Sequence, residues 1–371
     1  MTSVDATPPR LLDLAEMEER ARESLGEMAY AYYSGGAEHE RLIEENVTAW
    51  SRWQLHPRVL LDVSSVSTQS TVLGSPVSMP IVIAPTALHR LAHPDGELAT
   101  ARAASEAGAA MVLSSLATAD LDDVAQAAPD GVRLMQVYIL KDRGRTAEMV
   151  RRAAAAGYRA LVFTVDVPVS GLRTREVEQG VRLPDRFALP NLADPAAGHG
   201  AGGGCMAQVV KEFDPALTVD DIEWLAGLSG LPVVVKGLCR GDDAVRCADA
   251  GAAAVVVSNH GGRQLDDAPP TALSLPEVVD AVGDRMEVYV DGGIRRAGDV
   301  MKALALGAHG VLIGRPFLWA LATGGGDGVR ELLGSFGEEL ARVMALCGAV
   351  DVAGIDRSLV RSVDGHPGER R

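Results

Sequence analysis

Eight short apolar segments, separated by alanine-rich segments, constrain the fold of this chain more than any other feature of its sequence. Each is rich in valine, isoleucine or leucine and lacks a strict apolar–polar alternation, which is typical of strands buried on both faces. They span residues 79–87, 110–115, 133–139, 160–166, 232–238, 253–260, 287–293 and 310–316. Between them, apolar residues recur at helical spacing, as in 96–109, 144–158 and 298–310.

Strands that alternate with helices form parallel sheets, and eight strands of similar length predict a closed (β/α)8 barrel, the TIM-barrel class of α/β folds. An open, doubly wound sheet is the alternative. The length of 371 residues fits one barrel with insertions, so we expect a single domain over residues 1–361. Residues 1–78 form a helical N-terminal extension that covers the barrel, and residues 362–371 form a disordered tail.

A long gap, residues 176–215, separates the fourth and fifth strands and contains the sequence AAGHGAGGGC. Glycine and alanine at this density do not favour a rigid backbone, so we expect a mobile loop above the functional face of the barrel. An insertion without function is the alternative reading of this segment.

The net charge of −15, without a long basic block, makes nucleic acid and anionic membranes poor partners. No uninterrupted apolar stretch is long enough to span a bilayer. The four cysteines are far apart and lack the spacing of metal ligands, which predicts reduced thiols in a cytoplasmic protein and no metal site.

Functional residues of a (β/α)8 barrel collect at the C-terminal ends of its strands, and polar residues end nearly every strand here. The last two strands end in DGGIRR (291–296) and IGRP (312–316). Glycine amides approach an anion closely, and Arg295 and Arg315 add fixed positive charge. This pair of motifs predicts a phosphate site.

Four ionisable residues at other strand ends indicate chemistry at the same mouth of the barrel. His260 can exchange protons near neutral pH, and the planar fork of Arg263 suits a carboxylate. Asp166 is placed to orient His260. Lys236 is a buried ammonium that needs a negative partner, which could be a phosphate, a reduced flavin, a Schiff-base substrate or an internal salt bridge.

These motifs resemble those of the FMN-dependent L-2-hydroxy-acid oxidases and dehydrogenases, the family of glycolate oxidase, lactate oxidase and mandelate dehydrogenase. The most specific is SNHGGRQLD (258–266). The resemblance runs in one order from about residue 12 to about 360 and is weakest across 178–215. Its other segments are YYSGGAE (32–38), APTALHRLAHPDGE (84–97), QVYILKDR (136–143), TVDVP (164–168), VVVKG (233–237), DGGIRR (291–296) and LIGRP (312–316).

The resemblance implies a catalytic role for four residues. His260 would remove the substrate's α-proton, or take the hydroxyl proton as a hydride leaves the carbon. Asp166 would stabilise the protonated imidazole, and Tyr138 would bond the hydroxyl oxygen of the substrate. Lys236 would neutralise charge on the reduced flavin.

The resemblance also implies the binding residues. Arg263, Arg173 and Tyr32 would bind the substrate's carboxylate. The flavin ring of FMN would be held around Thr86, Ala87, Ser114, Gln136, Thr164, Lys236 and Ser258, and its phosphate would lie on Asp291, Gly292, Gly293, Arg295, Gly314 and Arg315.

Two positions bear on substrate and electron acceptor. Leu116 stands where members that oxidise small hydroxy acids commonly carry a tryptophan, which favours an aromatic substrate such as mandelate or 4-hydroxymandelate. Drift at a packing position is the alternative, and it leaves glycolate or lactate open. Ala87 resembles the pattern of the oxidases, so we expect O2 to be reduced to H2O2.

Other functional classes stay open at this point. One is a flavin-dependent non-redox isomerase, which the carboxylate-binding set argues against. Another is a flavin-free aldolase that uses Lys236 as a Schiff-base nucleophile, and a third is a non-catalytic flavin-binding protein. The expected partners are a small 2-hydroxy acid and O2, and the family analogy predicts a homotetramer.

Overall fold

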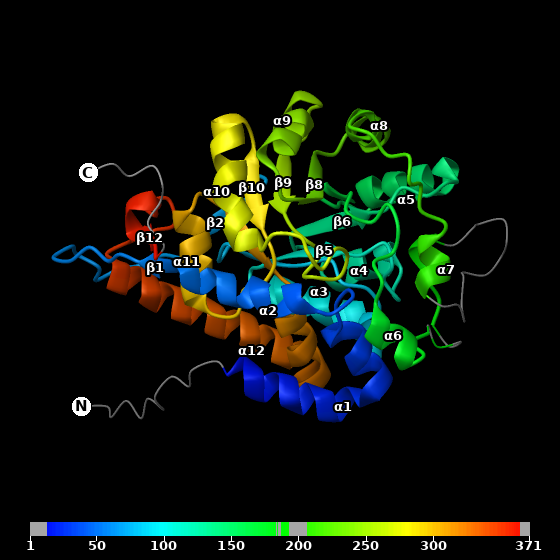
Figure 1. Ribbon diagram of the computed structural model, residues 1–371, viewed down its shortest axis with the longest axis horizontal. Coiled ribbons are helices and arrows are strands. Elements are labelled where there is room, and N and C mark those ends of the chain that lie inside the picture. The colour runs from blue at the N-terminus through cyan, green and yellow to red at the C-terminus, as the bar shows by residue number, and fades with distance from the viewer. Residues whose placement is uncertain (1–12, 183, 185–186, 193–205, 364–371) are drawn as a thin grey trace.

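The protein is described by a computed structural model for residues 13–182, 184, 187–192 and 206–363. Eight parallel strands form a closed barrel, in the order β4-β5-β6-β7-β8-β9-β10-β11, in which β11 pairs with β4 (Figure 1). They are β4 (Ile81–Ile83), β5 (Ala110–Leu113), β6 (Arg133–Val137), β7 (Leu161–Thr164), β8 (Val233–Leu238), β9 (Ala254–Val257), β10 (Glu287–Val290) and β11 (Gly310–Ile313). Every strand lies inside a predicted segment, so the predicted TIM barrel is confirmed.

Helices surround the barrel and connect its strands (Figure 1). The predicted helical segments 96–109, 144–158 and 298–310 are confirmed by α3 (Gly96–Glu106), α5 (Arg143–Ala155) and α11 (Ala297–Ala305). The others on the barrel are α4 (Leu121–Ala127), α8 (Asp220–Ser229), α9 (Gly241–Asp249), α10 (Thr271–Val282) and α12 (Arg315–Cys347), with short 3-10 turns η2 (His89–Leu91), η4 (Gly283–Arg285) and η5 (Arg357–Leu359). A non-helical residue, Gly325, kinks α12.

The barrel interior is filled by alternate residues of its strands. Val112, Val162, Val234, Val256 and Tyr289 belong to one buried cluster, separate from the larger cluster that includes the surrounding helices. Because successive side chains of a strand point to opposite faces, the residue two positions further on lies on the same face. This period places Ser114, Thr164, Lys236, Ser258 and Asp291 at the inner C-terminal rim.

The N-terminal extension contributes to both ends of the barrel. At one end is the hairpin of β2 (Ser70–Val72) and β3 (Ser75–Val77), where the Leu73 N–H donates to Glu287. Near the other end lie α1 (Leu14–Ser34), α2 (Arg41–Thr48) and η1 (Ala49–Arg52), and the Ala37 N–H donates to the Gly262 carbonyl at 2.8 Å. A further strand, β1 (Trp53–Leu55), pairs with β12 (Val360–Ser362). The described part of the predicted extension, residues 13–78, therefore contacts both ends of the barrel, and its residues 1–12 lie outside the described residues.

The segment after β7 carries the short helices α6 (Thr174–Glu178), η3 (Pro190–Leu192) and α7 (Met206–Val210). Residues 183, 185–186 and 193–205 of the predicted loop, and 364–371 of the predicted tail, lie outside the described residues. The predictions of a mobile loop and a disordered tail therefore stay predictions. Among the helices that the structure describes, none is both long and apolar enough to cross a membrane.

Gly293 provides a test of the contact between the N-terminal extension and the barrel. Its φ is +79°, and an added Cβ would lie 1.9 Å from the Asn46 carbonyl oxygen. We expect Gly293→Ala to lower the free energy of unfolding by about 3 kcal/mol or more, because backbone must move on both sides of the contact. Urea unfolding followed by circular dichroism measures this change.

Gly298, within α11, supplies the matched control. A Cβ there meets no atom within 4 Å, so Gly298→Ala should leave the free energy of unfolding unchanged or raise it by about 0.5–1 kcal/mol. Equal stability of the two variants would show that the extension is not held against Gly293.

Candidate active site

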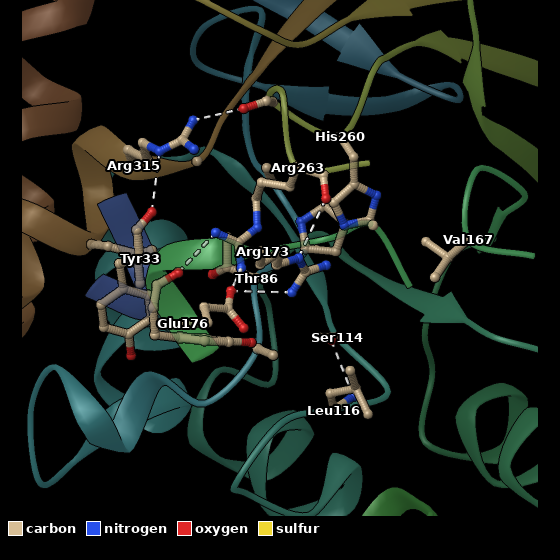
Figure 2. A pocket seen from close by; sticks show the side chains of 18 of the residues that line it. Tyr33, Thr86, Ser114, Leu116, Val167, Arg173, Glu176, His260, Arg263 and Arg315 are labelled. Atoms are coloured by element: carbon tan, nitrogen blue, oxygen red, sulfur yellow. Dashed lines mark hydrogen bonds and ion pairs between the residues drawn. The ribbon is translucent and has the colours of Figure 1, made fainter. Parts of the chain in front are cut away.

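A cavity of 770 Å³ opens at the C-terminal mouth of the barrel, within the range of roughly 300–1,000 Å³ typical of ligand sites (Figure 2). Most of the predicted site residues line it: Tyr32, Thr86, Ala87, Ser114, Tyr138, Arg173, Lys236, His260, Arg263, Asp291, Gly292, Gly293, Arg295, Gly314 and Arg315. Gln136 and Thr164 are buried at the ends of their strands. Asp166 and Ser258 line a neighbouring cavity of 690 Å³.

His260 and Asp166 form a hydrogen-bonded pair beside the cavity. The imidazole Nδ1 lies 2.9 Å from the Asp166 Oδ1. Because an ionised carboxylate can only accept, this bond assigns the proton to Nδ1 and leaves Nε2 free as a base. The turn that presents the ring is tight: His260 has φ +58°, and the two glycines after it also have positive φ.

The charges around this pair set its protonation. Burial lowers the pKa of His260, and the charge and hydrogen bond of Asp166 oppose that shift. Burial would raise the pKa of Asp166, but His260 and Lys236 hold it below its usual value. At neutral pH the pair is therefore a neutral imidazole held by a carboxylate, the arrangement of a general base.

Lys236 is buried at the end of β8 and has an ionic partner within the protein. Its Nζ lies 3.1 Å from the Asp291 Oδ2 and donates to the Ser258 hydroxyl at 2.8 Å. Burial would lower the pKa of Lys236, but Asp291 and Asp166 raise it. Lys236 is thus a fixed cation rather than a neutral amine, which disfavours the aldolase hypothesis.

Two arginines meet in the cavity, where Figure 2 shows them beside Glu176. The Arg263 Nη2 donates to the Glu176 Oε1 at 2.9 Å, and the Arg173 Nη1 donates to the same oxygen at 3.3 Å. Arg175, the second arginine of the segment GLRTRE (171–176), pairs with Glu40 instead. The structure therefore brings together Arg173 and Arg263, the two arginines that the family resemblance names.

Glu176 is a residue of this site that the sequence reasoning missed. The sequence spacing could have indicated Glu176, because it follows Arg173 by three residues at the start of a helix. Residues three apart lie on the same side of a helix. Its contact with Arg263, 87 residues away in the chain, could not be read from local spacing.

Three tyrosines lie close together in the segment YAYY (30–33), and Tyr32 is the one whose hydroxyl has no hydrogen-bond partner among the described residues. The Tyr30 hydroxyl donates to Glu18 at 3.2 Å, and the Tyr33 hydroxyl donates to the Leu88 carbonyl at 2.6 Å. In the described part of the chain, the Tyr32 hydroxyl has no hydrogen-bond partner, and the Arg263 guanidinium lies 5.3 Å from the centre of its ring. Burial raises the pKa of Tyr32, so its hydroxyl stays protonated and can donate.

Tyr138 is held by an aromatic contact from the segment after β7. Its ring stacks on Phe213 with 4.3 Å between centroids and 18° between planes. Burial, and then the charge of Asp166, raise the pKa of Tyr138, so it also remains a donor. The contribution of Phe213 was not predicted, because Phe213 follows a segment whose apolar residues show neither helical nor strand spacing.

The predicted phosphate end of the cavity carries two half-buried cations, Arg295 and Arg315. Within the described ranges, no carboxylate lies within ion-pair distance of Arg295 or Arg315. The Arg315 guanidinium donates only to the backbone carbonyls of Tyr33, Gly261 and Gly35, at 2.9–3.1 Å. Burial, together with the charges of Arg263 and Arg295, lowers the pKa of Arg315 to about 9. An anion bound beside Arg295 and Arg315 would offset the free-energy cost of keeping these two charges away from water.

The residues at the barrel rim also fit the remainder of FMN. The Gln136 Nε2, the Thr164 Oγ1 and the Asp291 Oδ1 are buried without a hydrogen-bond partner in the described structure. Buried polar atoms are rarely left unpaired, and the flavin ring and ribityl hydroxyls offer donors and acceptors for them. Because a carboxylate repels a phosphate, the Asp291 side chain suits the ribityl hydroxyls better than the phosphate.

Comparisons with known proteins agree with this geometry. The profile of the FMN-dependent dehydrogenase family matches residues 21–362. The chain is 44% identical to human (Homo sapiens) 2-hydroxyacid oxidase 1, over 95% of this chain and 97% of that protein. It is 47% identical to the L-lactate oxidase of Nostoc sp., over 94% and 98% of the two chains. A structure of mandelate oxidase with (S)-4-hydroxymandelic acid is 43% identical, with a TM-score of 0.86 over 92% of this chain and 96% of the other.

The pair of His260 and Asp166 yields a prediction on protonation. Since Asp166 raises the pKa of His260 against the effects of burial, Lys236 and Arg173, Asp166→Asn should lower it further. NMR titration of protein labelled at the histidine nitrogens measures the shift. Asp122→Asn, at a carboxylate that pairs with Arg152 in another part of the protein, should leave the resonances of His260 in place. An unchanged or raised pKa in Asp166→Asn would contradict the prediction.

Proposed function

The chain belongs to the FMN-dependent dehydrogenase family, whose 2-hydroxy-acid oxidases are its relatives, and we propose that it oxidises an aromatic L-2-hydroxy acid, such as mandelate or 4-hydroxymandelate, to the 2-keto acid. One observation carries this proposal. The cavity joins a base, His260, to the two guanidinium groups of Arg173 and Arg263. A substrate with a carboxylate next to an oxidisable carbon matches that pairing.

FMN is the cofactor of this family and, when bound, would accept the two electrons that leave the substrate and pass them to an acceptor, which we propose to be O2. The half-buried cations Arg295 and Arg315 would hold its phosphate, together with the backbone of Gly292, Gly293 and Gly314. The ribityl hydroxyls would bond Asp291, and the ring would contact Thr86, Ala87, Ser114, Gln136, Thr164, Lys236 and Ser258.

The substrate would be oriented by its carboxylate. Arg173 and Arg263 would bind that group from one side, and the Tyr32 hydroxyl would donate to it. Tyr138 would donate to the hydroxyl oxygen of the substrate, which becomes the carbonyl oxygen of the product. Such positioning accounts for a large part of the rate in enzymes that hold the reacting atoms in contact.

His260 would accept a proton at Nε2. In one order of events that proton leaves the α-carbon, and in the other it leaves the hydroxyl group while the α-hydrogen departs as hydride. Both orders produce an imidazolium that the carboxylate of Asp166 stabilises at 2.9 Å. Lys236 keeps its charge in both and supplies fixed positive potential at the rim where the flavin ring would lie.

The preference for an aromatic acid rests on the cavity wall. Leu116 lines the cavity close to Ser114, and Val167, Val181 and Phe213 contribute further apolar surface (Figure 2). The structural similarity to mandelate oxidase supports this choice. A small aliphatic acid is the alternative, favoured by the similarity to 2-hydroxyacid oxidase 1 and L-lactate oxidase.

The remaining parts of the proposal concern the acceptor and the setting of the enzyme. Ala87 lines the cavity, and relatives in both sequence and structure are named oxidases, which supports O2 as acceptor with H2O2 as product. A cytoplasmic location is consistent with the free thiols of Cys239, Cys247 and Cys347. A homotetramer remains a proposal from the family analogy.

The two arginines near His260 suit a carboxylate better than the diphosphate that the isomerase hypothesis requires.

The role of His260 can be tested in a single turnover. We expect His260→Ala to retain FMN but to slow anaerobic bleaching of the flavin by S-mandelate by roughly 100- to 10,000-fold, because the base is lost. Stopped-flow absorbance measures the rate, and the exposed residue His56 offers a control, His56→Ala, that should bleach at the wild-type rate. An unchanged rate in His260→Ala would refute its role, and a wild-type protein that no 2-hydroxy acid bleaches would refute the function.

Leu116 provides the test of substrate size. Leu116→Trp adds bulk to the cavity wall, so kcat/KM for mandelate should fall by roughly tenfold or more relative to that for L-lactate. Steady-state peroxide assays with both acids give the ratio. If the ratio does not change, Leu116 does not contact the part of the substrate that distinguishes the two acids.

A further inference from the structure

We propose that Glu176 is an internal competitor of the substrate: its carboxylate occupies the arginine pair until a substrate carboxylate displaces it. The inference rests on the proposed function, because it takes Arg173 and Arg263 as the carboxylate-binding residues. It adds a residue that sets substrate affinity without acting on the reacting atoms.

The geometry of Glu176 is that of a bound carboxylate. One oxygen, Oε1, accepts from both Arg263 and Arg173, at 2.9 and 3.3 Å. The three side chains are only 10–15% exposed, so water screens their attraction weakly. In the described part of the protein, no other carboxylate lies within ion-pair distance of either arginine.

Several other donors of the two arginines bond to neighbouring parts of the protein. Its Nη1 donates to the carbonyls of Tyr32 and Gly35, both at 2.8 Å. The Arg173 Nε donates to the Arg263 carbonyl at 3.3 Å. In the protein without substrate, the groups of the two arginines that bind a carboxylate are the Arg263 Nη2 and the Arg173 Nη1, and that carboxylate is Glu176.

In the protein without substrate, the contact with Glu176 reduces the electrostatic repulsion between Arg173 and Arg263. Burial and the neighbouring charge of Arg173 lower the pKa of Arg263, and Glu176 opposes that shift. Two guanidinium groups in one cavity repel each other, and a carboxylate between them removes much of that cost. A second carboxylate cannot share the place, because like charges in contact repel strongly.

Exchange of the two carboxylates does not require the helix to move. Arg175, the residue before Glu176, fixes α6 to the N-terminal extension through Glu40 and through the Ser34 hydroxyl at 3.0 Å. The Glu176 side chain has three rotatable bonds and can turn away while its backbone stays in place. The cost of displacement falls on every substrate, so it raises KM more than it changes kcat.

The test measures the affinity for carboxylates that cannot be oxidised. Calorimetric titration of the FMN-loaded protein with phenylacetate should give a Kd about tenfold lower for Glu176→Gln than for wild type, a change of about 1.4 kcal/mol. The KM for mandelate should fall in parallel, with a smaller change in kcat. Glu178→Gln removes a charge from the exposed face of the same helix and should bind phenylacetate as wild type does.

A second variant covers the case in which Glu176→Gln does not fold. Glu176→Asp keeps the charge but shortens the side chain, so its carboxylate should release Arg263 and lower the Kd for phenylacetate by a smaller factor. FMN content and circular dichroism identify the folded variants.

The outcomes separate the two claims. A Kd that is unchanged or raised in the folded variants would overturn the inference, because Glu176 would then support the arginines instead of competing for them. If wild type neither binds phenylacetate nor is bleached by any 2-hydroxy acid, the proposed function fails as well. Binding and bleaching by wild type, with no effect of either substitution, would remove the inference alone.

Discussion

The two-residue period of strands in a closed barrel decides where the functional side chains of this protein lie. Val162, Val234 and Val256 fill the interior, and two residues further along the same strands stand Thr164, Lys236 and Ser258. Since a closed barrel has no edge, a strand cannot slip without moving its whole inner row. The register that fixes the apolar core therefore also fixes the positions of the polar rim, which suits a site that has to hold a cofactor and a substrate in contact.

Part of the positive charge at this rim is balanced by neighbouring carboxylates, in a chain with a net charge of −15. Lys236 is paired with Asp291 at 3.1 Å, and Arg263 with Glu176 at 2.9 Å, whereas among the described residues Arg315 has only backbone carbonyls as partners. Buried charges without counter-ions are costly, so the cations that lack a carboxylate mark the place where an anionic ligand contributes most to stability. The distribution of paired and unpaired cations thus supports the proposal that FMN phosphate and substrate carboxylate bind at different ends of one cavity.

The barrel and most of the site could be predicted from the sequence because both depend on local patterns. Apolar runs identified all eight strands, and the residues that end those runs, such as His260 and Lys236, followed from the rule that such folds are functional at one face. Contacts between distant segments could not be predicted in this way. Glu176 meets Arg263, and Phe213 stacks on Tyr138, through packing of a segment whose sequence has no clear period. Asp291 was expected near a phosphate, but its side chain pairs with Lys236. This contact arises because both side chains point into the barrel from their strands.

Residues of the N-terminal extension, such as Tyr32 and Asn46, contact a site whose base, His260, and several of whose cations come from the last third of the chain. The Arg263 guanidinium donates to the Tyr32 carbonyl, 231 residues earlier, and the side-chain amides of Asn46 and Asn259 exchange two hydrogen bonds, at 2.9 and 2.8 Å. During synthesis, the N-terminal extension must therefore wait, exposed, until nearly the whole barrel has left the ribosome. Contacts this far apart in sequence also form slowly. Capture of the cofactor is consequently a late event in the life of each molecule, and a chain truncated before its last strands has no binding site to fill.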